Sequence, residues 1–230
     1  NITGTLPAIS GANLTGLTSG AKPNLIRNGD MQVAQRSETN TVAQANNSNE
    51  GFATVDGWSL QFGTNAGGTI TTSRATEAPA GFGTSYKLDV TTADTSISGN
   101  ELVYFTQVIE AQHMRNSGWE YTSASSDITL SFWVKNSKTG IYCIALISND
   151  SGRMYTAEYT VSSANTWEKK TITISGNANL VFNNDADYGL TVYFMLANAS
   201  GRSGTAGSWQ SGNLYGTSNQ VNFLDSTSNV

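Results

Sequence analysis

The chain has few of the residues that usually cross-link a small protein, rigidify its backbone or serve in catalysis. It carries one cysteine, one histidine and three prolines among 230 residues. A single cysteine, Cys143, cannot form an internal disulfide, so stability has to come from packing or from assembly. Its neighbours in "GIYCIALIS" are apolar, which predicts a buried thiol. Because His113 is the one histidine, the sequence places no Ser-His-Asp or Cys-His site, and no catalytic residue is expected.

Charged residues are also scarce, at 13%, and the net charge is -5. The chain therefore lacks a basic field that would attract nucleic acid or anionic lipid, and neither is expected as a partner. No run approaches the roughly 18 apolar residues of a membrane helix, so membrane insertion is not expected. The acidic residues Asp150, Asp185 and Asp187 lack the spacing of a calcium loop, which predicts turns; no metal and no cofactor is expected.

What the chain does contain is Gly, Ser, Thr and Asn, with 10% aromatic residues, a composition that favours short strands and tight turns. "DITLSFWVK" alternates, with Phe132 and Val134 on the inner face and Trp133 on the outer face. "GIYCIALIS" is apolar on both faces, as in an inner strand. Further strands are predicted at residues 52–61, 69–74, 86–90, 101–108, 153–161, 167–174 and 189–196, with a strand start at residues 31–34. Only "VIEAQHMRNSG" indicates a helical turn, so the pattern predicts an all-β antiparallel sandwich or jelly roll.

Residues 1–22 form a separate leader, in which a branched aliphatic residue, a small hydroxyl residue and a glycine recur as "ITG", "ISG" and "LTG". Such sparse aliphatic residues cannot bury themselves within one chain, because they offer too little apolar area to offset the ordering of the backbone. Several chains wound together can bury them on a shared axis, which favours an oligomerisation segment; a flexible linker is the alternative. The aliphatic residues expected at these contacts are Ile2, Ile9, Leu14 and Leu17. Residues 23–230 are expected to form the β-sandwich head.

The glycine-rich stretch "GSWQSGNLYGTSNQ" combines aromatic rings with amides. Sugars stack their C–H faces on exposed rings while amides bind their hydroxyl groups, so this stretch is the candidate carbohydrate site. Its candidate residues are Trp209, Gln210, Asn213 and Tyr215, and Trp119, Tyr121 and Trp133 are further possibilities. The alternative is that these residues serve as scaffold.

The chain contains, in this order, "NLIRNGDMQVAQRS", "DGWSL", "LSFWVKNSKTGIY", "NTWEKKTITI" and "AGSWQSGNLYGTSNQVNFLDSTSN". Together these motifs resemble a C-terminal β-sandwich domain of tail fibres and other appendages of tailed bacteriophages, notably phages of cyanobacteria and marine bacteria. The resemblance covers nearly all of residues 24–229. The leader resembles the "ISGANLTGL" repeats that precede such domains, where trimeric shafts are usual. The opening motif is also similar to the first strand of jelly-roll carbohydrate-binding modules, whose calcium-binding Glu is replaced here by Gln32.

The resemblance implies a non-enzymatic virion protein, a tail fibre or similar surface appendage, that forms a homotrimer and contacts other virion proteins. It also implies attachment to host-surface carbohydrate by a galactose-binding-like or carbohydrate-binding-module-like jelly roll. Two alternatives remain open: a purely architectural virion or decoration module without glycan binding, and a glycan-cleaving enzyme. The enzyme would need two carboxylates across a cleft, and no motif singles out such a pair.

Overall fold

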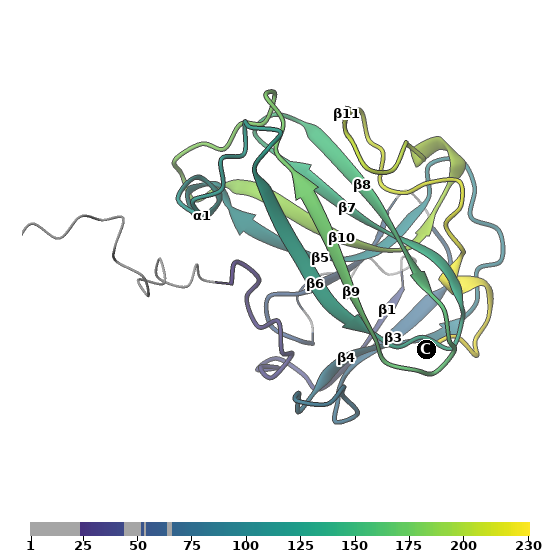
Figure 1. Ribbon diagram of the computed structural model, residues 1–230. Coiled ribbons are helices and arrows are strands. Elements are labelled where there is room, and N and C mark those ends of the chain that lie inside the picture. Colours follow the sequence, from purple (N-terminus) through teal and green to yellow (C-terminus); the bar gives the residue numbers. More distant parts are fainter. Residues whose placement is uncertain (1–23, 44–51, 53, 64–65) are drawn as a thin grey trace, which may run out of the picture.

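A computed structural model describes residues 24–43, 52, 54–63 and 66–230 (Figure 1). The expected leader segment, with Ile2, Ile9, Leu14 and Leu17, lies outside the described residues. The larger elements are β1 (Thr39–Ala43), β2 (Ser59–Gly63), β3 (Thr69–Ala75), β4 (Ser85–Thr92), β5 (Leu102–Glu110), α1 (Ala111–Arg115), β6 (Asp127–Val134), β7 (Gly140–Ser148), β8 (Arg153–Val161), β9 (Glu168–Ser175), β10 (Tyr188–Asn198) and β11 (Trp209–Ser211). Two short 3-10 helices, η3 (Ser200–Arg202) and η4 (Phe223–Asp225), lie near the C-terminus.

One layer of the fold is a six-stranded sheet with the order β11-β8-β7-β10-β5-β2. All neighbouring strands in it pair antiparallel. The apolar strand β7 lies between β8 and β10, which confirms its expected inner position. Cys143 on this strand is fully buried, as its apolar neighbours predict.

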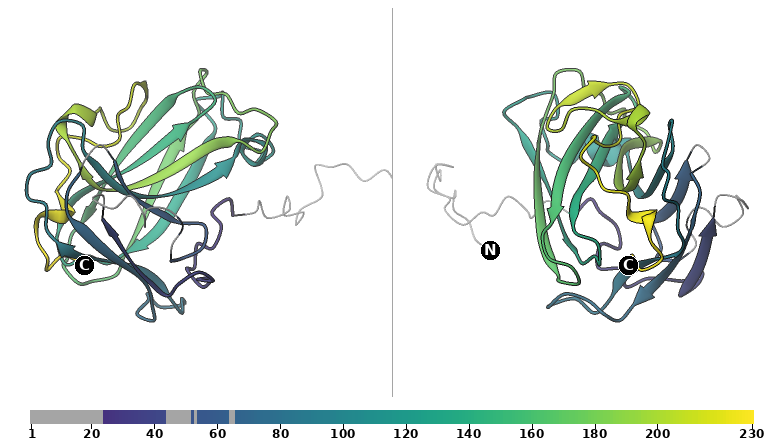
Figure 2. Two further views of the ribbon diagram at one scale, coloured as in Figure 1. Left: turned by 180° about the vertical axis from the view of Figure 1, so that it is seen from behind. Right: turned by 90° about the vertical axis from the view of Figure 1, so that its right-hand side faces the viewer.

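The second layer is divided into two sheets, β1-β3-β4 and β6-β9, and both pack on the six-stranded sheet (Figures 1 and 2). One apolar core lies under β6 and β9 and contains Trp58, Ile144 and Phe194. Another lies under β1, β3 and β4 and contains Ile70 and Val90. The chain is therefore an all-β antiparallel sandwich, as the alternating pattern predicts.

The opening motif forms a turn that contacts the second motif, "DGWSL". Asn28 has a positive φ of 48°, and its side-chain amide donates to the carbonyl oxygens of Val33 (2.9 Å) and Asp56 (2.8 Å). The indole of Trp58 donates to the Asn28 carbonyl oxygen at 3.3 Å. "NGD" and "DGW" thus lie together, although they are far apart in the chain.

The predicted strand start at residues 31–34 is wrong. Residues 31–34 form no strand, Met31 has a positive φ of 58°, outside the β region, and the first strand in the described residues is instead β1 at Thr39–Ala43. The strand predicted at residues 52–61 is shorter than expected at its start, since β2 begins at Ser59. Within the described residues no helix is long and apolar enough to cross a membrane.

Candidate functional site

Trp209 belongs to the inner side of the six-stranded sheet. It lies on β11, opposite Tyr155 of β8, and the two rings are 5.4 Å apart. Its indole N–H donates to the carbonyl oxygen of Ser175, the last residue of β9, at 2.8 Å. Trp209 therefore ties β11 to the opposite layer, and both contacts are those of a structural side chain.

Tyr215 packs on the other side of the same sheet, next to the outward-facing rings of Tyr104 on β5 and Tyr193 on β10. Its ring centroid is 6.3 Å from that of Tyr104, nearly parallel to it, and 5.3 Å from that of Tyr193. The ring centroids of Tyr104 and Tyr193 are 4.9 Å apart, and the rings meet edge to face at 73°. We call these three residues the tyrosine cluster. The structure thus separates Trp209 from Tyr215 by the thickness of a sheet.

The other two candidate residues, Gln210 and Asn213, differ from each other in their surroundings. Gln210 uses its side chain within its own loop, donating to the Thr205 carbonyl oxygen at 2.5 Å. Asn213 is exposed. Of the expected site residues, Tyr215 alone is brought into an aromatic group on the outer face, and the role of the other three stays a prediction.

Polar side chains border the tyrosine cluster. On β2, the Gln61 side-chain oxygen accepts a hydrogen bond from the Tyr104 hydroxyl at 3.0 Å. Beside Tyr215, the backbone N–H of Tyr215 donates to the Arg202 carbonyl oxygen at 2.9 Å. A Cβ atom on the next residue, Gly216, would lie 2.7 Å from Cγ of Asn198, so a side chain there would displace Asn198.

Several polar atoms next to Gly216 are buried and have no hydrogen-bond partner among the described residues. They are Oδ1 of Asn198, Nε of Arg202 and both side-chain polar atoms of Gln220. Buried polar groups in native proteins nearly always have a partner, either protein or water. Ordered water is the usual partner of such buried polar atoms.

Burial raises the pKa of both Tyr193 and Tyr215, and in Tyr215 the charge of Arg202 opposes the rise. Both residues therefore stay neutral at physiological pH and keep hydroxyl groups that donate and accept. The cluster offers stacking surfaces and neutral hydrogen-bonding groups, which is the chemistry that an uncharged sugar requires.

Tyr104 and Tyr193 were missed by the sequence reasoning, although a signal was present. In the strand at residues 189–196, alternation places Leu190, Val192, Phe194 and Leu196 on one face, which leaves Tyr193 on the other. Single outward aromatic residues are normal on a protein surface, and only a contiguous group of them marks a site. No pattern shows that the loop carrying Tyr215 folds back onto it.

The further aromatic possibilities differ in exposure. Trp119 is 5% exposed and its indole donates to the Ser126 carbonyl oxygen, so it is part of the core. Tyr121 packs edge-on against Phe182 with the ring centroids 4.9 Å apart. Trp133 is 38% exposed on the outer face of β6, as its alternation predicts.

The acidic residues form turns, as expected. The carboxylate of Asp150 accepts from the backbone and side chain of Asn183, which closes one loop against another. In the part of the chain that the structure describes, no group of three or more His, Cys, Asp or Glu residues could hold a metal ion. His113, on the short helix α1, has a side chain 58% exposed and lies 4.0 Å from Glu110.

No family model matches the chain, and no curated protein matches it. Two solved structures are similar in part. One is the enzymatically active domain of tailspike protein 4 of bacteriophage CBA120, with 20% identity and a TM-score of 0.38 over 64% of this chain and 20% of that chain. The other is a CBM4 protein, with 14% identity and a TM-score of 0.37 over 75% of this chain and 89% of that chain.

Proposed function

We propose that the protein is the head of a tail fibre or similar appendage of a tailed bacteriophage, and that it attaches to carbohydrate on the host surface without cleaving it. The sequence motifs support the assignment to a phage appendage. The tyrosine cluster supports carbohydrate as the ligand. Other virion proteins are its remaining partners in this proposal.

The observation that carries the proposal is the meeting of Tyr104, Tyr193 and Tyr215 on the outer face of the six-stranded sheet. Rings held at 4.9–6.3 Å from one another give a preformed aromatic surface that loses little entropy on binding. The polar groups next to the rings are the tyrosine hydroxyls themselves, Gln61, which is hydrogen-bonded to Tyr104, and the charged Arg202 near Tyr215. We propose the tyrosine cluster, rather than Trp209, as the surface on which a sugar stacks. The Trp209 indole already donates to Ser175 and its ring packs against Tyr155.

A homotrimer is part of the proposal, with Ile2, Ile9, Leu14 and Leu17 on a shared three-fold axis. A shallow sugar site binds weakly by itself. Three linked sites raise the overall affinity by about 10²-fold or more, because the second and third contacts are intramolecular. The proposal thus needs only the few rings and amides that the outer face offers.

The test is a glycan array probed with the wild-type protein and with Tyr104→Ala, accompanied by an assay for released reducing sugar. Tyr188→Ala is the matched control, because Tyr188 is a tyrosine on β10 that is 62% exposed and outside the cluster. We expect the wild type and Tyr188→Ala to bind the same glycans, Tyr104→Ala to lose at least about tenfold in affinity, and no variant to release sugar.

Each other result has a defined meaning. Absence of any glycan binding, with stable incorporation into virions, would favour the architectural alternative. Release of reducing sugar would establish an enzyme. Equal binding by Tyr104→Ala and the control would place the site elsewhere on the head.

A further inference from the structure

A positively charged residue, Arg202, lies beside the tyrosine cluster. It is the last residue of η3, which follows β10. Its carbonyl oxygen accepts hydrogen bonds from the backbone N–H groups of Tyr215 at 2.9 Å and Gly216 at 3.4 Å, and Ser203 forms a parallel bridge with Gly216. These backbone contacts hold Arg202 next to the residue that supplies the third ring of the cluster.

The side chain of Arg202 has no hydrogen-bond or ion-pair partner in the described part of the chain. All other arginine side chains there donate to a carboxylate, carbonyl or hydroxyl oxygen; they are Arg27, Arg36, Arg74, Arg115 and Arg153. Nε of Arg202 is buried, whereas Nη1 and Nη2 are not among the buried unpaired atoms. The end of this guanidinium group is therefore open to solvent.

The acidic residues of this region are already engaged elsewhere. Glu158 of β8 lies opposite Cys143, which packs beneath the tyrosine cluster. Its Oε1 accepts from the Thr217 hydroxyl and, at 3.1 Å, from the Asn219 side-chain amide. The carboxylate of Glu101, at the start of β5, accepts from the Ser98 N–H at 2.6 Å. Neither carboxylate pairs with Arg202.

The charge of Arg202 acts directly on the cluster. Burial raises the pKa of Tyr215, and the guanidinium charge of Arg202 opposes that rise. The effect places the charge close to the Tyr215 hydroxyl. The rings and hydroxyls by themselves suit an uncharged sugar, but such a ligand would leave this charge unpaired.

The geometry of the guanidinium group favours a carboxylate as its partner. Its planar N–H groups match the two oxygens of a carboxylate in a bidentate pair. Because Nε is buried, the Nη1–Nη2 edge is the part that a ligand can reach. A phosphate monoester carries a charge of about −1.5 to −2 at pH 7, which calls for a second cation.

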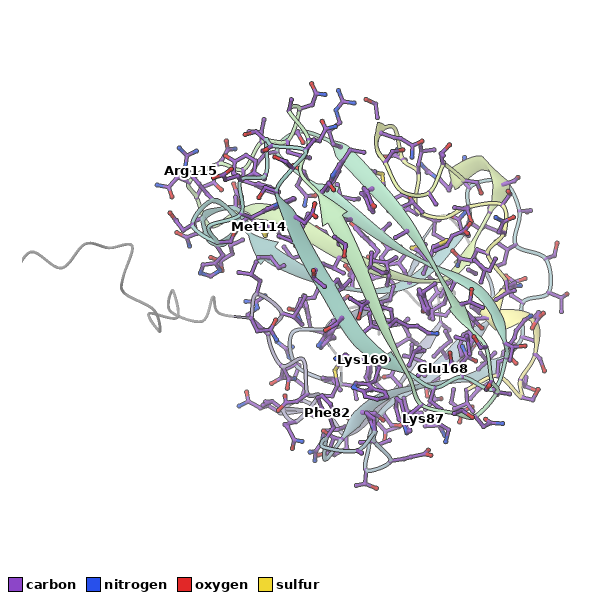
Figure 3. The ribbon with its side chains drawn as sticks, in the orientation of Figure 1. Phe82, Lys87, Met114, Arg115, Glu168 and Lys169 are labelled. Atoms are coloured by element: carbon purple, nitrogen blue, oxygen red, sulfur yellow. The ribbon has the colours of Figure 1, made fainter. Side chains whose placement is uncertain are left out.

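No second free cation is available beside Arg202. Among the described residues, the other Lys or Arg side chain without a partner is Lys169. Figure 3 shows Lys169 near Glu168 on β9, which belongs to the layer opposite the six-stranded sheet. A single negative charge on the ligand therefore matches the single positive charge at the cluster.

We propose that the tyrosine cluster and Arg202 together select a sugar that carries a carboxylate, a hexuronic acid, over its uncharged counterpart. This inference rests on the proposed function, because it names the class of glycan that the same surface binds. The sugar ring stacks on a tyrosine of the cluster, and its carboxylate pairs with Nη1 and Nη2 of Arg202. Since the chain as a whole has a net charge of -5, the preference comes from this contact and not from long-range attraction.

The first test uses the wild-type protein and matched pairs of glycans. Each pair consists of a short oligomer of glucuronic, galacturonic, mannuronic or guluronic acid and the same oligomer after its carboxylates are reduced to primary alcohols. We expect at least one acidic oligomer to bind at least about tenfold more tightly than its reduced form. Raising the salt concentration from about 0.05 to 0.5 M should remove most of this advantage, because the pair is partly exposed.

The second test assigns the preference to Arg202. Arg202→Gln is expected to bind the acidic and reduced forms equally, and Arg202→Lys to keep part of the preference, because it retains the charge without the planar fork. Lys169→Gln is the control for loss of one positive charge and should behave as the wild type. Tyr104→Ala should weaken binding of both forms by at least about tenfold. Melting temperatures of all variants show whether they are folded.

The outcomes separate this inference from the proposed function. Equal binding of the acidic and reduced forms by the wild type would overturn the acidic preference and leave glycan attachment standing. A folded Arg202→Gln that keeps the full preference would overturn the role of Arg202. Absence of binding to any glycan would overturn both proposals. If Arg202→Gln does not fold, the wild-type comparison and its salt dependence decide the question.

Discussion

At the scale of single residues, Trp209 and Tyr215 show why a loop rich in aromatics is ambiguous. They are six positions apart in one glycine-rich stretch, yet they pack on opposite faces of the six-stranded sheet. We predict that Trp209→Ala lowers the free energy of unfolding by about 2 kcal/mol, because a half-buried ring contact and the hydrogen bond to Ser175 are lost together. Urea unfolding measures this change. Unchanged stability combined with lost glycan binding would return Trp209 to the site.

Buried tyrosines predict a limit to stability at alkaline pH. Burial raises the pKa of Tyr86 to about 12 and also raises the pKa of Tyr142 and Tyr159. A tyrosine whose pKa is higher in the folded than in the unfolded state contributes stability that is present below about pH 10 and is lost as the pH rises through the folded-state value. The melting temperature should therefore fall above about pH 10.

The variant Tyr86→Phe tests the origin of this fall, because phenylalanine cannot ionise. Its melting temperature is expected to decrease less steeply between about pH 10 and 12 than that of the wild type. Tyr188→Phe is the control, since Tyr188 is exposed. Identical slopes for the wild type and Tyr86→Phe would show that Tyr86 does not ionise on unfolding.

At the scale of elements, the alternation of apolar and polar residues predicts well where a strand lies in the sequence. It predicts poorly which other strands pair with it. The pattern of "DITLSFWVK" correctly places Phe132 inward and Trp133 outward on β6. The edge strands β1 and β11 are not predicted, because they are short and polar and their position depends on pairing with β3 and β8. The tyrosine cluster is unpredictable for a related reason: each ring comes from a different element, and the path of the 199–216 segment decides whether they meet.

β6 also offers a direct test of the core. The ring of Phe132 lies 5.1 Å from that of Phe194 and 5.1 Å from that of Tyr159, so it joins β6 to the six-stranded sheet. We predict that Phe132→Ala destabilises the protein by about 3 kcal/mol, near the lower end for buried phenylalanine, because the ring is half-buried. Ser131→Ala on the exposed face is the control and should change stability by less than about 0.5 kcal/mol. Equal effects of the two substitutions would contradict the packing of β6.

At the scale of the whole molecule, the proposed trimer depends on the leader. Replacing Ile9 and Leu14 with Asp would place charges on a buried shared axis and weaken association by several kcal/mol. Native mass spectrometry or light scattering at micromolar concentration measures the oligomer. A wild-type chain that is monomeric with its leader intact would rule out the shared axis, whereas a trimer that survives both substitutions would place its contacts in the head.

The central claim is that the outer face of the six-stranded sheet binds a sugar at the tyrosine cluster. The most direct measurement is a crystal structure of the protein with the strongest glycan-array ligand. The account predicts a sugar ring stacked on Tyr104, Tyr193 or Tyr215, with hydroxyl groups within hydrogen-bond distance of Gln61 or Arg202. A sugar bound on the face of Trp133, with the tyrosine cluster empty, would contradict it.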